Sequence, residues 1–371
     1  MDLTTNFMGL RLKNPVIVGA GPLTGNGDLM RKAVQAGAGA VVTKTIVNEI
    51  RPNVRPRLYF ADKNMQNIEL YSEFTLEEWE KQITFAKKHG AVVIANIMAH
   101  TPSEMSYIAR RVEQFGADAI ELGISIPHGE GMEILVSNPD RLYELVTSAV
   151  SKVNIPVMVK LSSSVVNITK LAKAAEKAGA SAISAIDTVR SIIGVDINKG
   201  KTLLPTYGGY SGPAIRPIGL ASVAAVSQAV NIPVCGIGGI EDSENVLEYM
   251  MLGASVVQMC TSLIVNGVGH ISEVIRDLEN WMDAKGYVNY EQIRGLALAS
   301  LKSFEEIKVN PFVASIQKKC TIQHCNICKT ACIYDAIDRV NDNIMVKNEL
   351  CTGCGLCVSI CPNNCFKFIW K

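Results

Sequence analysis

Eight short apolar runs, each followed by a longer stretch with helical periodicity, constrain the fold of this chain most strongly. The runs are Pro15–Ala20, Ala40–Lys44, Val92–Ile97, Asp118–Leu122, Pro156–Leu161, Ser181–Ile186, Pro233–Gly238 and Ser255–Met259. Most are continuously apolar, which is typical of parallel strands buried on both faces. The stretches between them predict helices over Asp28–Ala36, Leu76–His89, Pro102–Phe115, Pro139–Val150, Asn167–Ala178, Gly219–Val230 and Asp242–Met251. This alternation indicates a parallel (β/α)8 TIM barrel.

An open, doubly wound sheet is the competing fold for the same alternation. Such a sheet commonly carries a G-x-G-x-x-G turn after its first strand, and no such turn follows the first apolar run here. The barrel is therefore the favoured interpretation.

Residues 320–371 carry nine cysteines, eight of them in two groups of four, and the second group reads C-x2-C-x2-C-x3-C-P. This run holds one iron–sulfur cluster and lends its fourth cysteine to a neighbouring one. We therefore expect two 4Fe–4S clusters, ligated by Cys320, Cys325, Cys328 and Cys361 and by Cys351, Cys354, Cys357 and Cys332. The longer first gap also occurs in two-iron ferredoxins, so that alternative stays open. Cys365 is a ninth cysteine of this region and a spare thiol.

A change of periodicity after the eighth run divides the chain. We predict a barrel over residues 1–305, a linker over 306–319 and a small ferredoxin-like domain over 320–371. The stretch Gly295–Val309 is predicted to be helical.

Composition excludes several classes of partner. Lys and Arg number 36 against 35 Asp and Glu, and no basic run interleaves with aromatic residues, so nucleic acid is not expected. No apolar stretch reaches the length of a membrane span, and Met1–Lys13 lacks the apolar region of a signal peptide. Cysteines at metal-ligand spacing favour a reducing compartment, so we expect a soluble, cytoplasmic protein that does not bind membranes. We also expect a homo-oligomer.

The ends of the apolar runs are the candidate site, because barrel active sites lie at the carboxyl ends of the strands. Two lysines, Lys44 and Lys160, end their runs, and a charge there needs a partner, for which we expect an anionic cofactor. Glycines follow the seventh run and lie between residues 208 and 212, where backbone N–H groups suit a phosphate. A flavin also links two-electron chemistry to one-electron clusters, so these features predict FMN.

Several phrases together resemble a known family. They include Val42-Thr43-Lys44-Thr45, Asn67-Ile68-Glu69-Leu70, the stretch from Tyr207 to Pro217 and the cysteine tail. With these, the chain resembles the class 1 dihydroorotate dehydrogenases, and more closely the FMN and iron–sulfur portion of dihydropyrimidine dehydrogenase. The match runs nearly end to end.

The resemblance implies roles for individual residues. Asn67 would contact a substrate amide, and Lys160 would lie at the flavin ring edge that gains negative charge on reduction. The flavin ring and ribityl chain would contact Ala20, Gly21, Lys44, Asn96, Lys160 and Thr188, and the phosphate would contact Gly212, Gly238, Gly239, Cys260 and Thr261. The resemblance also implies a small-molecule substrate, and a partner that exchanges electrons with the clusters, either an FAD subunit that oxidises NAD(P)H or a ferredoxin.

Three departures from the family concern the substrate and the proton. The family's Asn-x-Ser-Cys-Pro loop, whose cysteine moves a proton, reads Gly123-Ile124-Ser125-Ile126-Pro127 here, and the family's Asn-Thr is Asp187-Thr188. Since Ile126 cannot exchange a proton, Asp187, His128 and Glu130 are the candidate catalytic groups, in that order.

We therefore expect an FMN- and iron–sulfur-dependent oxidoreductase that acts on a C–C bond next to a carbonyl, with an altered or non-pyrimidine substrate. The alternatives are an electron-transfer subunit without its own organic substrate and a genuine dihydropyrimidine or dihydroorotate dehydrogenase. A tRNA-modifying flavoenzyme shares the barrel, but the charge balance gives it no support.

Overall fold

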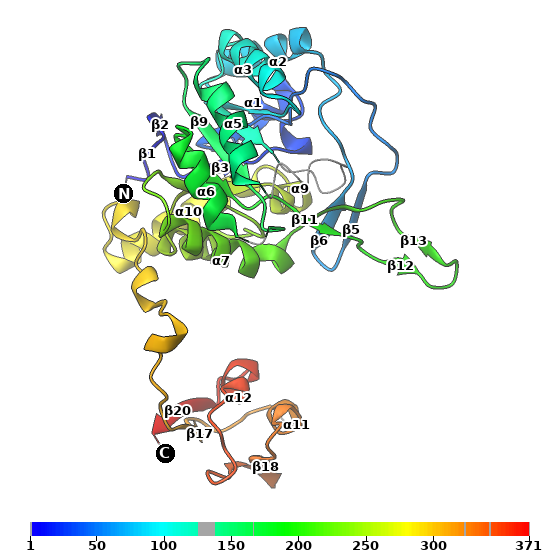
Figure 1. Ribbon diagram of the computed structural model, residues 1–371. Helices are drawn as coiled ribbons and strands as arrows, with labels where there is room; N and C mark the ends of the chain where they lie inside the picture. The colour runs from blue at the N-terminus through cyan, green and yellow to red at the C-terminus, as the bar shows by residue number, and fades with distance from the viewer. Residues whose placement is uncertain (1, 125–137, 166, 323, 341–342, 371) are drawn as a thin grey trace. The chain divides into compact units, whose positions relative to one another are not determined.

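A computed structural model describes residues 2–124, 138–165, 167–322, 324–340 and 343–370 (Figure 1). The chain divides into two compact units, Met1–Ser300 and Leu301–Lys371. Within the described part of the chain, none of the helices has the length and apolar character that a membrane crossing needs.

Eight parallel strands close a barrel in the first unit. They are β3 Val16–Val18, β4 Ala40–Val42, β7 Val93–Ile97, β8 Ala119–Gly123, β9 Val157–Leu161, β10 Ala182–Ala185, β15 Val234–Ile237 and β16 Ala254–Met259. Each pairs with its neighbours in chain order, and β16 pairs with β3 to close the ring. The predicted TIM barrel is confirmed, with strand boundaries within two residues of those expected.

Helices cover the outside of the barrel (Figure 1). They are α1 Gly27–Gln35, α2 Leu76–Lys88, α3 Pro102–Gln114, α5 Pro139–Val150, α6 Ile168–Lys177, α7 Arg216–Ser227, α8 Ser243–Met251 and α10 His270–Lys285. Most begin at a side chain that accepts a backbone N–H of the first turn, as Thr75 does for α2 and Asp242 for α8. Their apolar faces pack on the strands and form the larger core.

A second core fills the barrel interior, with residues from all eight strands. These are Ile17, Ala40, Val42, Ile94, Ala119, Met158, Ala182, Cys235 and Val256. Phe7 and Leu12, from the hairpin of β1 Thr5–Phe7 and β2 Leu10–Leu12, join them and close this end of the barrel. Since side chains alternate along a strand, positions two residues further on form the next interior layer toward the carboxyl ends. That layer is mostly polar: Gly19, Lys44, Asn96, Glu121, Lys160, Ser184, Ile237 and Gln258.

An antiparallel sheet, which the sequence did not predict, lies beside the barrel (Figure 1). Its order is β11 Val189–Ser191, β14 Gly208–Ser211, β6 Asn64–Asn67 and β5 Leu58–Ala61, and a hairpin of β12 Val195–Asp196 and β13 Lys201–Thr202 extends from it. The Gln66 side chain donates to the carbonyls of Ser191, at 3.0 Å, and Thr206, at 3.2 Å. These bonds fix two distant segments of the chain at the rim of the barrel.

The predicted helix over Gly295–Val309 is wrong. Only two short 3-10 turns, Leu298–Ser300 and Phe304–Glu306, occur there. Residues 301–311 are exposed, so a helix there would have no surface against which to bury an apolar face. The sequence did not predict α10, which follows the last barrel strand and the short helix α9 Thr261–Asn266.

The second unit is built on two antiparallel strand pairs and two short helices. Strand β17 Phe312–Ile316 pairs with β20 Phe366–Trp370, and β18 Ile337–Val340 pairs with β19 Asn343–Val346. The helices are α11 Ile327–Ala331 and α12 Leu356–Ile360. Its buried core includes four cysteines, Cys328, Cys357, Cys361 and Cys365. A core this small, with thiols in place of large apolar side chains, depends on additional stabilisation such as bound metal.

Candidate active site

Two adjoining cavities open at the carboxyl ends of the barrel strands. The larger has a volume of about 510 Å³ and the smaller about 130 Å³. Both are lined by Ala20, Gly21, Asn67, Lys160, Asp187 and Thr188. Gly212, Gly238, Gly239, Cys260 and Thr261 line the larger cavity, and Lys44 and Asn96 line the smaller one. The structure therefore brings together all the residues predicted to contact the cofactor, together with Asn67 and Asp187.

A buried ion pair lies at the cavity floor, where Lys160 lines both cavities and Glu121 lies behind it. The Lys160 Nζ atom lies 2.8 Å from Oε1 of Glu121, which is fully buried on β8. Burial opposes ionisation of Glu121, but the charge and hydrogen bond of Lys160 outweigh it and hold the pKa of this carboxyl below its usual value. Burial likewise acts to lower the pKa of Lys160, but Glu121 and then Asp187 raise it overall. Both members of the pair are therefore charged at neutral pH.

Three further side chains donate to the Glu121 carboxylate. They are the amides of Asn96 and Gln258, each at 2.7 Å, and the hydroxyl of Ser184 at 2.9 Å. With their NH2 groups engaged, the buried oxygens Oδ1 of Asn96 and Oε1 of Gln258 have no hydrogen-bond partner among the described residues. Buried polar atoms are normally paired, so these two acceptors at the cavity walls fit a ligand with N–H or O–H donors. The imide and ribityl hydroxyls of FMN are such donors.

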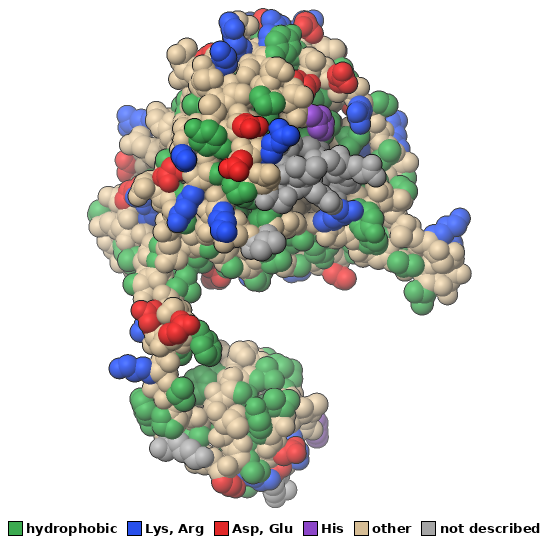
Figure 2. All heavy atoms as spheres, in the orientation of Figure 1, with side chains coloured by type: hydrophobic (Ala, Val, Ile, Leu, Met, Phe, Trp, Pro, Cys, Tyr) green, Lys and Arg blue, Asp and Glu red, His purple; other side chains and the backbone are tan. Residues whose placement is uncertain are grey.

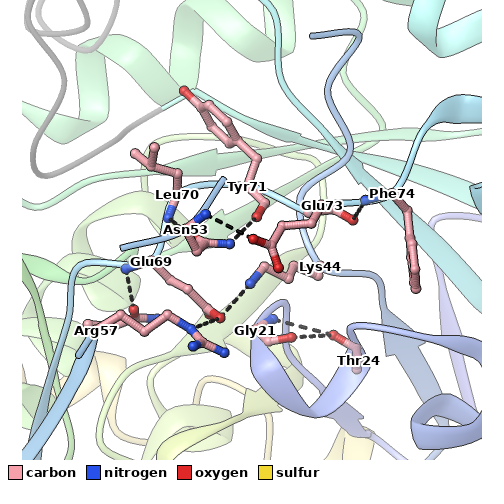
Figure 3. Close-up of polar contacts among 12 residues, drawn as sticks. Gly21, Thr24, Lys44, Asn53, Arg57, Glu69, Leu70, Tyr71, Glu73 and Phe74 are labelled. Atoms are coloured by element: carbon pink, nitrogen blue, oxygen red, sulfur yellow. Dashed lines mark hydrogen bonds and ion pairs between the residues drawn. The ribbon is translucent and has the colours of Figure 1, made fainter. Parts of the chain in front are cut away.

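A second ion-pair cluster lies at the smaller cavity (Figure 3). Lys44 Nζ and Arg57 Nε lie 2.7 and 2.8 Å from the same oxygen of Glu69. Burial opposes ionisation of Glu69, but both cations outweigh it and lower the pKa of this carboxyl. Each lysine therefore has a carboxylate partner within the protein, and neither depends on an anionic cofactor for one.

Closely packed glycine loops form the far end of the larger cavity. Gly212 and Gly239 have φ values of +107° and +67°, a region that favours glycine. A Cβ at Gly239 would lie 2.8 Å from the carbonyl oxygen of Gly212, so the two loops touch backbone to backbone. Thr261 donates to the Ser211 hydroxyl at 2.8 Å nearby. Bare backbone in the loops after β14 and β15 fits a phosphate, so the residues present fit FMN at both ends.

Of the three catalytic candidates, the structure describes only Asp187. Asp187 lines both cavities, and one of its oxygens accepts the backbone N–H of Thr188 at 2.8 Å. Ile126, His128 and Glu130 lie outside the described residues. Figure 2 draws the residues outside the described part of the chain in grey.

Sequence reasoning missed Glu121, Gln258, Glu69, Arg57 and Tyr249. Tyr249, on α8, donates its hydroxyl to the carbonyl of Gly238 at 2.7 Å and so supports a cavity loop from behind. An acid inside an apolar run was a usable signal for Glu121, since a buried charge needs a partner.

The tail cysteines gather in two places. Cys332, Cys351, Cys354 and Cys357 line one small cavity. Burial, followed by the neighbouring thiolates of Cys351, Cys354 and Cys332, raises the pKa of Cys357 to about 11. Cys361 and Cys325 likewise act, after burial, to raise the pKa of Cys328. These neighbours are the members of the two predicted ligand sets, and the ligand assignment itself stays a prediction.

Backbone N–H groups point at three of these sulfurs, since Ala314, Ala336 and Cys365 donate to Cys351, Cys332 and Cys361, each at 3.3 Å. No three Cys, His, Asp or Glu side chains of the described residues converge closely enough for a single ion. A cubane takes one thiolate per iron, so its four sulfurs lie further apart than the ligands of one ion.

Comparison with known proteins identifies both units. The family described as "Dihydroorotate dehydrogenase" matches residues 2–282, and the family described as "4Fe-4S binding domain" matches residues 344–367. The second unit therefore contains an iron–sulfur binding domain.

Curated relatives match the barrel over nearly their whole length. Proteins named "Dihydroorotate dehydrogenase B (NAD(+)), catalytic subunit" from Thermoplasma volcanium and Pyrococcus abyssi are each 36% identical to this chain, covering 80% of it and 99% of the relative. The protein of the same name from Methanosarcina mazei is 38% identical, covering 80% of this chain and 95% of the relative. About a fifth of this chain thus lies outside these alignments. The chain belongs to the dihydroorotate dehydrogenase family.

Proposed function

We propose that this protein is an FMN- and iron–sulfur-dependent oxidoreductase that oxidises or reduces a C–C bond next to a carbonyl group. The observation that carries the proposal is the continuous pair of cavities, with the Lys160–Glu121 pair at the floor, unsatisfied amide oxygens on the walls and bare glycine loops at the far end. We propose further that the chain, in joining such a barrel to an iron–sulfur tail, resembles the corresponding portion of dihydropyrimidine dehydrogenase.

Different residues of the chain would bind FMN and hold the substrate proton. FMN, when bound, supplies hydride transfer and one-electron exchange with clusters. Asn96 and Gln258 would accept hydrogen bonds from it, the glycine loops would hold its phosphate, and Lys160 would place a positive charge beside its ring. Asp187 lines both cavities, so its carboxylate is the first candidate among the described residues to hold the substrate proton.

The charge balance of the site favours a neutral substrate. At or directly behind the walls of the smaller cavity lie three cations and three carboxylates: Lys44, Arg57 and Lys160, and Glu69, Glu121 and Asp187. Asp187 completes this balance, and an asparagine there would leave one positive charge in excess. A substrate carboxylate such as that of dihydroorotate therefore finds no net attraction, and would meet Asp187 as a like charge.

A genuine dihydroorotate or dihydropyrimidine dehydrogenase is the second candidate, favoured by the names of the relatives. Steady-state assays with dihydroorotate, orotate, uracil and thymine on the wild type and on Ile126→Cys separate the two. We expect negligible wild-type turnover, because losing a general acid or base typically lowers the rate by about 10²–10⁴. Substantial wild-type turnover of any of these compounds would instead establish the second candidate.

Flavin bleaching tests whether the chain has an organic substrate at all. Anaerobic reduction of the bound flavin by a small molecule carrying a C–C bond next to a carbonyl, or reoxidation by its unsaturated form, supports the enzyme. A flavin that responds only to protein partners or chemical reductants would show a relay subunit.

The electron partner follows from the same proposal. We propose that a separate FAD subunit that oxidises NAD(P)H, or a ferredoxin, exchanges electrons with two 4Fe–4S clusters in the tail. The purified chain should then show little NAD(P)H oxidase activity, and fast flavin reduction by NAD(P)H alone would contradict this. A homo-oligomer remains a prediction that sedimentation of the purified protein tests.

A further inference from the structure

We infer that Glu121 is a positioning residue that keeps the flavin reduction potential low by neutralising Lys160 beneath the cofactor. This inference rests on the proposed function, since it requires FMN in the larger cavity. Glu121 lines neither cavity and acts only through the side chains it holds.

The geometry makes Glu121 the centre of the polar layer. Its carboxylate is fully buried and binds Lys160, Asn96, Gln258 and Ser184 at 2.7–2.9 Å. The first three of these line a cavity, and they come from three different strands, β9, β7 and β16. One carboxylate therefore sets the positions of one cation and two amides that face the ligand.

The electrostatics follow from burial. The Lys160–Glu121 pair has no net charge, and its side chains are 8% and 0% exposed, so solvent does not screen either charge from a ligand above. The cluster of Lys44, Arg57 and Glu69 carries one excess positive charge, but Arg57 is 37% exposed and is screened. A flavin gains negative charge on reduction, and a bare Lys160 cation would stabilise that charge. Glu121 opposes the effect.

The test is the variant Glu121→Gln, which keeps the shape of the side chain and removes its charge. We expect its preference for reduced over oxidised FMN to rise at least tenfold, a positive shift of about 30 mV in the two-electron midpoint potential. Spectroelectrochemistry of the purified FMN-containing protein measures this directly, and a merely structural role would not move the potential in this direction.

The pH dependence gives a second signature. The titratable groups that face Lys160 are Glu121 on β8, Asp187 after β10, Cys235 on β15 and Cys260 after β16. Glu121 raises the pKa of Lys160, so this pKa falls in the variant. Lys160 must be protonated to shift the potential, so the difference between variant and wild type should grow as the pH is lowered through the pKa of Lys160 in the variant.

A matched control lies next to the same strand. Asp118, directly before β8, accepts from Lys87 at 2.5 and 2.6 Å and from the backbone of Val93 at 2.7 Å, away from both cavities. Asp118→Asn also breaks a carboxylate–lysine pair. We expect the preference of this variant for reduced over oxidised FMN to stay within threefold of that of the wild type. Glu121→Asp retains the charge and should stay within the same range.

The outcomes separate the two proposals. Wild-type protein that contains no FMN refutes the proposed function. If the wild-type protein contains FMN but the midpoint potential of Glu121→Gln shifts no more than that of Asp118→Asn, this inference alone is overturned. If Glu121→Gln does not fold, the double variant Glu121→Gln/Lys160→Gln, which buries no unpaired charge, takes its place. Its preference for reduced over oxidised FMN should not rise above that of the wild type, and a tenfold rise would overturn the inference.

Discussion

Removing one buried hydroxyl, by Tyr249→Phe, tests whether the cavity loop is supported from behind. Tyr249 is fully buried, and its hydroxyl donates to the carbonyls of Gly238 at 2.7 Å and Ile237 at 3.2 Å. A Cβ at Gly219 would lie 1.9 Å from this hydroxyl, so glycine there is what allows the bond. Phenylalanine keeps the ring and leaves the carbonyls without this donor, which typically costs about 1–3 kcal/mol.

The predicted loss therefore lowers the folded-to-unfolded ratio by roughly five-fold to more than a hundred-fold, at about 1.4 kcal/mol per tenfold. Urea denaturation measures it, and fluorescence titration should show weaker FMN binding, because Gly238 loses its anchor. Tyr143→Phe is the control, since this ring on α5 is 38% exposed and its hydroxyl should matter by less than about 0.5 kcal/mol. A Tyr249→Phe variant as stable as this control would refute the assignment of the two buried hydrogen bonds.

Three further predictions concern the phosphate loop, the tail and the buried pair. Gly239→Ala places a Cβ 2.8 Å from a backbone carbonyl at a φ of +67°, and FMN titration should show an affinity lowered by about tenfold or more. The control is Gly90→Ala, at a φ of +80° with open space around it, which should lower stability and leave the FMN affinity intact. Cys354→Ser should lower iron from about eight atoms per chain by at least one cluster and retain the flavin, because the two units have separate cores; flavin lost together with iron would contradict this. The pKa of Glu121 lies below its usual value, so the stability that the ion pair contributes should be lost as the pH falls through the folded pKa of Glu121. The pKa of Lys160 lies above its usual value, so the same contribution should be lost as the pH rises through the folded pKa of Lys160. The melting temperature of the wild type should fall at both acid and alkaline pH, and its fall at acid pH should be weaker in Glu121→Gln. An unchanged fall at acid pH in this variant would contradict the assigned ion pair.

The barrel was predictable because its strands are buried on both faces, which leaves continuous apolar runs in the sequence. Fixed geometry then places the ends of those runs at one edge, so Lys44, Asn96 and Lys160 could be grouped from the sequence alone. The same logic reaches Glu121, since it lies two residues beyond Ala119 of the apolar interior layer and therefore points into the layer above.

The antiparallel sheet beside the barrel was not predictable in this way. Strands β6 and β14 read Asn-Met-Gln-Asn and Gly-Gly-Tyr-Ser, with no apolar run or clear alternation to mark them. Their pairing over more than 140 residues of sequence separation arises from tertiary contacts, among them the bonds of Gln66. The partnership of Lys44 with Glu69 depends on this sheet, so the sequence left Lys44 without its partner.

The pairing of β17 with β20 has a consequence for how the tail unit can be moved between proteins. Phe312 lies opposite Trp370 in this ladder, so the first and last residues of the folded segment lie next to each other. A segment whose two ends lie next to each other can be inserted into a surface loop without distorting either protein. We therefore expect residues 312–370 to retain their fold when they are inserted through short linkers into an exposed turn of an unrelated flavoprotein.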